Sequence, residues 1–178
     1  MPGPASSPIS SLTPSPETMP NAEPLIRLAE AGDAPAVASL IRALEVHYAD
    51  PGSTPEAALA VVSRSLAERE GTRYAVAFAG GRAVGLACFA VLRPGLTLQG
   101  LIFVKELFVA EDARGQAVGE AMMRWLAAYG RAHGIGRIDL TTDGGNRRAQ
   151  AFYERLGARR LDKAFYRFLL SDGGPGGL

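Results

Sequence analysis

A glycine-containing turn at residues 111–119 carries the clearest sign of chemistry in the sequence. It reads Glu-Asp-Ala-Arg-Gly-Gln-Ala-Val-Gly and lies between an apolar segment and a strongly periodic helix. The first amides of a helix lack partners within the helix, and the helix dipole adds partial positive charge, so phosphate is stabilised there. Glycine also lets a bulky anion approach the backbone. The pattern favours a pyrophosphate cradle, although an ordinary strand-to-helix loop fits the same residues.

Two other phosphate-binding motifs do not fit. The turn lacks the Gly-Lys-Ser/Thr ending of a nucleoside triphosphatase loop. Gly134-Ile135-Gly136 precedes an expected strand, whereas the glycines of a dinucleotide fingerprint follow one. The motif context therefore speaks against a plain nucleotide-binding module.

Two charged residues, Lys105 and Glu106, interrupt an otherwise apolar segment from Leu101 to Val109. A charge in a buried strand is costly unless it is paired or exposed in a cleft. Glu106 could act as a base toward a protonated amine, and a structural ion pair is the alternative. Adjacent strand residues face opposite ways, so without a bulge the two side chains cannot line one cleft.

Apolar periodicity predicts the elements that position these residues. The expected strands are 25–29, 74–79, 83–92, a long strand ending at 109, 138–142 and 165–170. The expected helices begin at Asp33 and Thr54 and span 116–131 and 146–156. Gly80-Gly81 is typical of a hairpin turn. A helix between the strands ending at 109 and 142 predicts that these two are parallel, which gives a mixed α/β layer.

Composition limits the remaining classes. A net charge of +1, from 19 basic and 18 acidic residues, predicts neither nucleic-acid nor membrane binding. The single cysteine, Cys88, is expected to be inert core, and the lack of a signal or spanning segment favours a cytoplasmic protein. Residues 1–23 and 171–178 are expected to be disordered around one folded domain of 24–170, with Met19 as a second possible start.

Two motifs, in this order, resemble the signatures of the GNAT superfamily of acetyltransferases. Residues 114–119 match its Arg/Gln-x-x-Gly-x-Gly/Ala loop, and 146–158 resemble its Asn-x-x-Ala-x-x-Phe-Tyr-x-x-x-Gly helix. The resemblance covers roughly 25–170. It implies an α/β (α+β layered) GNAT fold: a mixed sheet of six to seven strands, about four helices and a splayed parallel strand pair. Ala117 stands where the family usually has Gly, and a helical φ/ψ there would tolerate the methyl group.

The resemblance also implies an activity and its site residues. The activity is direct transfer of the acetyl group of acetyl-CoA to a primary amine in a ternary complex, without a metal. Tyr153 would protonate the leaving thiolate, since a phenol of pKa about 10 can donate to a thiolate of pKa roughly 8 to 9. Periodicity alone makes Tyr153 a core residue. The residues implied to contact acetyl-CoA are Leu107, Phe108, Val109, Arg114, Gly115, Gln116, Ala117, Val118, Gly119, Asn146, Phe152 and Tyr153.

The acceptor is the least constrained part of the assignment. Residues 104–109 resemble the diamine acetyltransferase branch, in which two acids precede the strand end. Glu106 matches the second acid and is the candidate base, whereas Lys105 replaces the first. With His47 and Tyr48, Lys105 is a candidate acceptor contact. The partner is expected to be a small amine, with a protein or peptide N-acetyltransferase and a non-catalytic coenzyme A sensor as alternatives, and the apolar 165–170 segment is compatible with a homodimer.

Overall fold

The computed structural model describes residues 23–48, 52–68, 71–94 and 98–167. They belong to two compact units, one ending at Leu140 and one beginning at Thr141, and each unit is described by itself. None of the helices in these ranges has the length and apolar character that a bilayer crossing requires.

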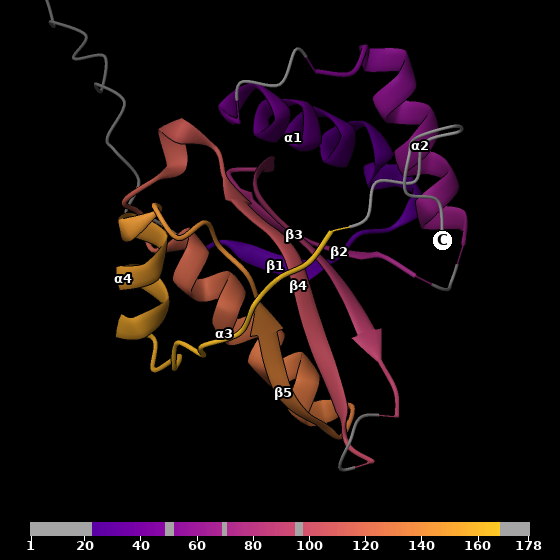
Figure 1. Cartoon of the computed structure of the whole chain (residues 1–178). Coiled ribbons are helices and arrows are strands. Elements are labelled where there is room, and N and C mark those ends of the chain that lie inside the picture. The colour runs from indigo at the N-terminus through magenta and orange to yellow at the C-terminus, as the bar shows by residue number, and fades with distance from the viewer. Residues whose placement is uncertain (1–22, 49–51, 69–70, 95–97, 168–178) are drawn as a thin grey trace, which may run out of the picture. The chain divides into compact units, whose positions relative to one another are not determined.

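A five-stranded sheet forms the centre of the first unit (Figure 1). Its strands follow chain order: β1 (Leu25–Leu28), β2 (Arg73–Ala79), β3 (Arg82–Leu92), β4 (Gly100–Val109) and β5 (Ile135–Leu140). Neighbours are antiparallel except β4 and β5, which are parallel as the sequence predicts. The described chain thus has five strands, and the expectation of six to seven is not matched.

The expected last strand, 165–170, accounts for part of that difference. Residues 165–167 are not in a strand, and 168–170 lie outside the described residues. Phe165 and Tyr166 are 70% and 81% exposed. Apolar residues favour a strand only where a neighbouring strand pairs the backbone and a core covers one face, and these two side chains have no such cover.

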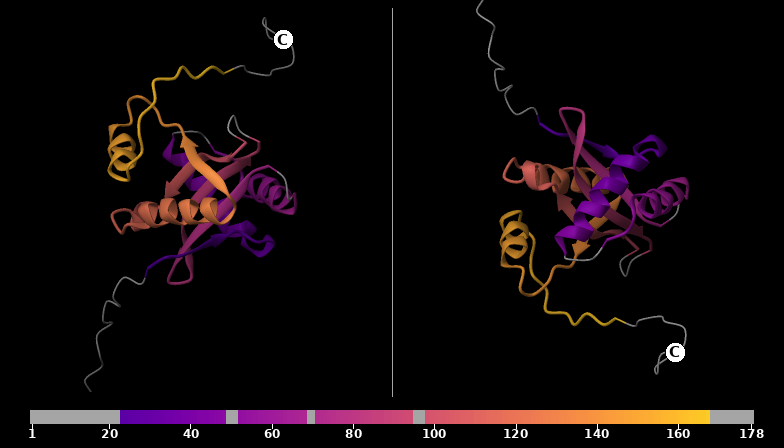
Figure 2. Two further views of the ribbon diagram at one scale, coloured as in Figure 1. Left: turned by 90° about the horizontal axis from the view of Figure 1, so that it is seen from below. Right: turned by 90° about the horizontal axis from the view of Figure 1, so that it is seen from above.

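Helices cover both faces of the sheet. Seen from one side, α3 (Val118–Ala132) lies in front of the strands, and seen from the opposite side α1 (Ala34–His47) and α2 (Pro55–Ala67) do (Figure 2). Alternate residues of β3 therefore enter two cores: Leu86 packs toward α1 and α2, and Phe89 toward α3. Because both faces are covered, β2 and β3 are almost continuously apolar.

Local sequence signals explain most element ends. Gly80 and Gly81 have φ of +55° and +77° and join β2 to β3 as a two-residue hairpin. Thr54 caps α2, accepting a hydrogen bond from the Ala57 amide at 3.2 Å. Asp33 precedes α1 as expected, but its side chain does not cap that helix. Its carboxylate instead accepts from the Arg27 guanidinium at 2.8 Å and from the Glu30 amide at 2.7 Å.

Candidate active site

The parallel pair β4 and β5 separates before β4 ends. Their register runs from Gly100 opposite Ile135 to Val104 opposite Leu140, where β5 stops, while β4 continues to Val109. Beyond Val104, the edge of β4 that faced β5 has no strand partner in the described ranges. The predicted splayed strand pair is therefore present in this unit.

Backbone groups at the end of β4 point into that opening. The Ala110 amide donates to the Val84 carbonyl at 2.9 Å, so these two residues form a hydrogen-bonded antiparallel pair. Val109, opposite Gly85, then belongs to the alternate, non-hydrogen-bonded type of pair, and so does Leu107. The N–H and C=O groups of Leu107 and Val109 consequently point away from β3, toward the side where β5 has ended.

A β-bulge at Lys105 places two charged residues at the separation point. Cys88 of β3 pairs with Glu106 and Phe89 pairs with Val104, so Lys105 is the extra residue. In a bulge two residues oppose one, and the strict alternation expected from the sequence does not apply. Lys105 is exposed and Glu106 is half-buried. Among the described residues neither belongs to a salt bridge, which disfavours the structural ion pair.

The environment of the bulge changes two ionisation equilibria. Partial burial raises the pKa of the Glu106 carboxyl above its usual value, and the Lys105 ammonium opposes that rise. The thiol of Cys88 is buried, which raises its pKa to about 12, with Glu106 adding to the rise and Lys105 reducing it. Cys88 is therefore an unreactive thiol in the core, as predicted, and Glu106 is a stronger base than an exposed glutamate.

The turn before α3 has the backbone expected of an anion cradle, with one difference. Gly115 has φ of +80°, and Ala117 also adopts the left-handed region, with φ of +58° and ψ of 8°. The predicted helix 116–131 includes Ala117, but α3 begins at Val118, two residues later than predicted, so the expectation of a helical φ/ψ at Ala117 is wrong. The first helical hydrogen bond of α3 runs from the Ala121 amide to the Ala117 carbonyl at 3.0 Å. The amides of residues 118–120 precede that bond and are the unpaired first turn of a helix.

Replacing Ala117 with Gly should stabilise the protein. An L-residue in the left-handed region costs roughly 1–2 kcal/mol, and the larger entropy of unfolded Gly returns part of that, which leaves a gain of about 0.5–1 kcal/mol. We expect the melting temperature to rise by about 1–4 °C in thermal unfolding. Ala128→Gly, in the exposed interior of α3, is the matched control and should lower it. A lower melting temperature in both variants would show that Ala117 is not strained.

Arg114 connects the turn to the end of α1. Its Nε donates to the Val109 carbonyl at 3.1 Å, and its guanidinium carbon lies 5.9 Å from the centre of the Phe108 ring. One terminal nitrogen is 3.5 Å from Nδ1 of His47. The His47 ring is 6.2 Å from that of Phe108 and 5.4 Å from that of Tyr48. The structure thus brings together residues predicted separately for acetyl-CoA and for the acceptor.

The remaining predicted site residues lie in the second unit, around α4 (Arg147–Arg155). Asn146 caps α4, accepting from the Ala149 amide at 3.0 Å. Phe152 and Tyr153 are half-buried, and their rings meet edge to face at 5.1 Å. Gly157, with φ of +88°, ends the segment as expected. The capping role is confirmed, and the contacts of these residues with acetyl-CoA stay a prediction.

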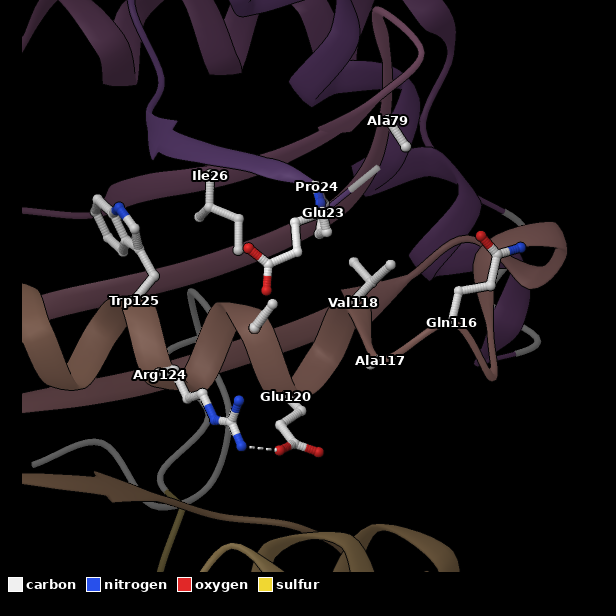
Figure 3. Close-up of a pocket in the computed structure, with 11 residues that line it drawn as sticks. Glu23, Pro24, Ile26, Ala79, Gln116, Ala117, Val118, Glu120, Arg124 and Trp125 are labelled. Carbon is white, nitrogen blue, oxygen red and sulfur yellow. Dashed lines mark ion pairs between the residues drawn. The ribbon is translucent and has the colours of Figure 1, made fainter. Parts of the chain in front are cut away.

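A groove of about 500 Å³ lies between β1 and α3 (Figure 3). Sequence reasoning missed it, because the α3 residues in its wall, such as Trp125, follow the stripe that predicts only core. Gln116 and Ala117 of the turn stand at one end of the groove, and the Glu23 side chain points into it. Its apolar wall consists of Pro24, Ile26, Ala79, Val118, Ala121 and Trp125.

Comparison with known proteins gives the architecture a family context. The model of the acetyltransferase (GNAT) family matches residues 38–158. An integron cassette protein from the mobile metagenome of V. cholerae superposes with a TM-score of 0.77 at 26% identity, over 83% of this chain and 93% of its own. No curated protein matches the sequence.

Two further solved structures share the fold and differ in what they act on. An aminoglycoside acetyltransferase from an uncultured soil metagenomic sample, in complex with sisomicin, has a TM-score of 0.71 at 19% identity, covering 83% of this chain and 97% of its own. A ribosomal-protein-alanine N-acetyltransferase from Brucella melitensis biovar Abortus 2308 has a TM-score of 0.70 at 20% identity, covering 83% and 99%. At these identities the likeness concerns the fold alone.

Proposed function

Since the chain belongs to the acetyltransferase (GNAT) family, we propose that it transfers the acetyl group of acetyl-CoA to a primary amine. The observation that carries the proposal is the splayed end of β4 beside the turn before α3. The end of β4 offers the outward-pointing backbone groups of Leu107 and the N–H of Val109, whose carbonyl accepts from Arg114, and the turn offers the unpaired first amides of a helix.

The two features suit the two halves of acetyl-CoA. The helix start would hold the pyrophosphate, because its unpaired amides and dipole favour an anion. The pantetheine arm, which carries amides, would pair with the open edge of β4 as a short strand does. The Val109 N–H would then stand beside the thioester carbonyl. A preorganised donor of that kind typically lowers the barrier by about 3 to 4 kcal/mol.

The reaction requires an amine nitrogen with a free electron pair. That nitrogen attacks the thioester carbon, a C–N bond forms, and the C–S bond breaks as the electron pair returns to sulfur. Glu106, directly or through water, accepts the proton that the amine loses. Tyr153 donates a proton to the departing thiolate. In this proposal the products are the N-acetylated amine and coenzyme A.

An acceptor screen tests the proposal against its two rivals. Thiol release from acetyl-CoA is followed with amino acids, simple amines, polyamines, aminoglycosides and N-terminal peptides, and products are identified by mass spectrometry. We expect turnover with a small amine. Turnover with peptides only would favour a protein N-acetyltransferase. Binding of acetyl-CoA without turnover on any acceptor would favour the sensor domain.

Lys105 should make a dication a poor substrate. It replaces a carboxylate that a diamine pocket would present, and an ammonium group beside the Glu106 carboxylate repels a second positive charge. We expect butylamine to exceed spermidine in kcat/KM, and Lys105→Glu to shift that ratio toward spermidine by about tenfold. A wild-type preference for spermidine that Lys105→Glu leaves unchanged would contradict this role.

A further inference from the structure

Arg114 is a half-buried arginine without a carboxylate partner in the described part of the chain. Its contacts are the Val109 carbonyl, Nδ1 of His47 and the face of Phe108. A guanidinium has five N–H donors, so these contacts leave most of them unused. Four arginines of this unit are paired with acids: Arg27 with Asp33, Arg82 with Asp112, Arg124 with Glu120 and Arg137 with Asp139. Arg42, Arg73 and Arg93 donate instead to the Ser53 carbonyl, the Tyr129 hydroxyl and the His133 carbonyl.

The guanidinium lies on the α1 side of the sheet. It stands over Phe108, whose ring is buried with α1 and α2, and beside His47 at the end of α1. Val118, the first residue of α3, packs into the core on the opposite face. The guanidinium of Arg114 and the side chain of Val118 therefore lie on opposite faces of the sheet.

Near Glu106, positively charged side chains outnumber buried carboxylates. Glu106 and Phe108 are two residues apart and share the α1 face of β4, so roughly 6–7 Å separates their positions. Lys105 and Arg114 bring two positive charges to this end of the strand, and Glu106 is the half-buried carboxylate among them. Glu111 and Asp112, in the turn after β4, are exposed, and Asp112 pairs with Arg82. An amine at Glu106 would leave that excess positive charge unmatched. An anionic group on the same substrate molecule would neutralise it.

We infer that Arg114 and His47 bind a carboxylate of the acceptor, so that the substrate is an amine carrying a carboxylate a few bonds away. This inference rests on the proposed transfer to an amine. Arg114 supplies a fork of donors that suits a carboxylate, and Phe108 holds the guanidinium in place. Because Nδ1 of His47 faces the Arg114 guanidinium, which only donates, Nε2 is the ring nitrogen that would donate to the carboxylate.

Matched substrates test the inference. The kcat/KM values of β-alanine and γ-aminobutyrate are compared with those of propylamine and butylamine, which lack only the carboxylate. We expect each acid to exceed its amine at least tenfold. Arg114→Gln and His47→Ala should each remove most of that preference, which is measured as the ratio of kcat/KM for each acid to kcat/KM for its amine. Arg131→Gln, which removes a charge from the exposed end of α3, should leave the preference intact.

Two results would overturn the inference. One is equal use of acids and amines by the wild type. The other is an Arg114→Gln variant that raises the KM for acetyl-CoA and affects both substrate classes alike, which would assign the guanidinium to the cofactor.

A binding measurement separates this inference from the proposed transfer. γ-Aminobutyrate should raise the melting temperature of the wild type in the presence of coenzyme A, and Arg114→Gln should abolish the rise. If that pattern appears without turnover on any amine, the transfer fails and the carboxylate site stands. If amines are acetylated but the acid causes no rise at millimolar concentration, the transfer stands and the carboxylate site is wrong.

Discussion

Tyr153→Phe is expected to lower kcat about 100-fold with the best acceptor, because it removes the proton donor for the leaving thiolate. The ring is kept, so its packing against Phe152 and the melting temperature should change little. The affinity for acetyl-CoA should also stay within about threefold. Steady-state thiol release, with acetyl-CoA binding measured in parallel, checks all three quantities.

Tyr166→Phe is the matched control for that experiment. Tyr166 lies in the same unit, is 81% exposed and stands outside the second signature, so its hydroxyl should not affect turnover. A wild-type kcat in Tyr153→Phe, measured with a good acceptor, would return Tyr153 to the structural role that helix periodicity alone suggests.

Glu106→Gln should lower kcat/KM for every amine about 100-fold at neutral pH, with the deepest loss between the pKa of Glu106, below which the wild-type carboxyl is itself protonated, and the pKa of the acceptor amine. Below its own pKa the acceptor is protonated and depends on a base, whereas at high pH the free amine is abundant and the variant should approach the wild type. Burial raises the pKa of Glu106, so the wild-type rate should rise as pH increases through a value above that of an exposed glutamate. The profile of kcat/KM between pH 5 and 10 measures both effects.

The stability of Glu106→Gln shows whether its loss of activity comes from the missing base or from a damaged fold. A carboxyl whose pKa is raised in the folded state binds its proton more tightly there, so its ionisation weakens the fold as pH rises through that pKa. Gln resembles the protonated form, and Glu106→Gln should therefore be at least as stable as the wild type at pH 7. Glu68→Gln, at the exposed end of α2, serves as the control. A variant with wild-type activity across the pH range would exclude Glu106 as the base.

Features set by local chemistry were predictable from the sequence. The apolar stripe of α3, the paired glycines between β2 and β3 and the Thr54 cap each depend on residues only a few positions apart. The parallel arrangement of β4 and β5 followed from a helix between two strands, since the connection restricts the strand directions. The cap at Asn146 was predictable for the same local reason.

Features set by distant partners were not predictable. The bulge at Lys105 depends on the register between β3 and β4, and periodicity within one strand cannot reveal it. Periodicity predicts a helix from residue 116, and it does not show that α3 begins at Val118, after Ala117. His47 and Arg114 are 67 positions apart, so only the fold brings them together. The apolar residues of 165–170 predict a strand, but a strand also needs a neighbouring strand to pair with, and residues 165–167 are not in one.

The site residues themselves came from the family motifs rather than from periodicity. Tyr153 lies on a stripe with Phe152 that helix geometry alone assigns to a core. Glu106 stood out because a charge in an apolar strand is costly, but its role as a base followed from the expected reaction. Only the structure shows that Glu106 is half-buried and that its pKa is raised.

Binding of acetyl-CoA tests the central claim most directly. A ligand at 100 times its Kd adds about 2.7 kcal/mol of stability, so a saturating concentration should raise the melting temperature by roughly 5–10 °C. Gly119→Val, which places a side chain at the start of α3, should abolish the rise. Gly32→Val, at a position with room for a side chain, should keep it. No rise at millimolar acetyl-CoA, with no heat of binding in calorimetry, would contradict the claim that the turn before α3 and the open edge of β4 form an acetyl-CoA site.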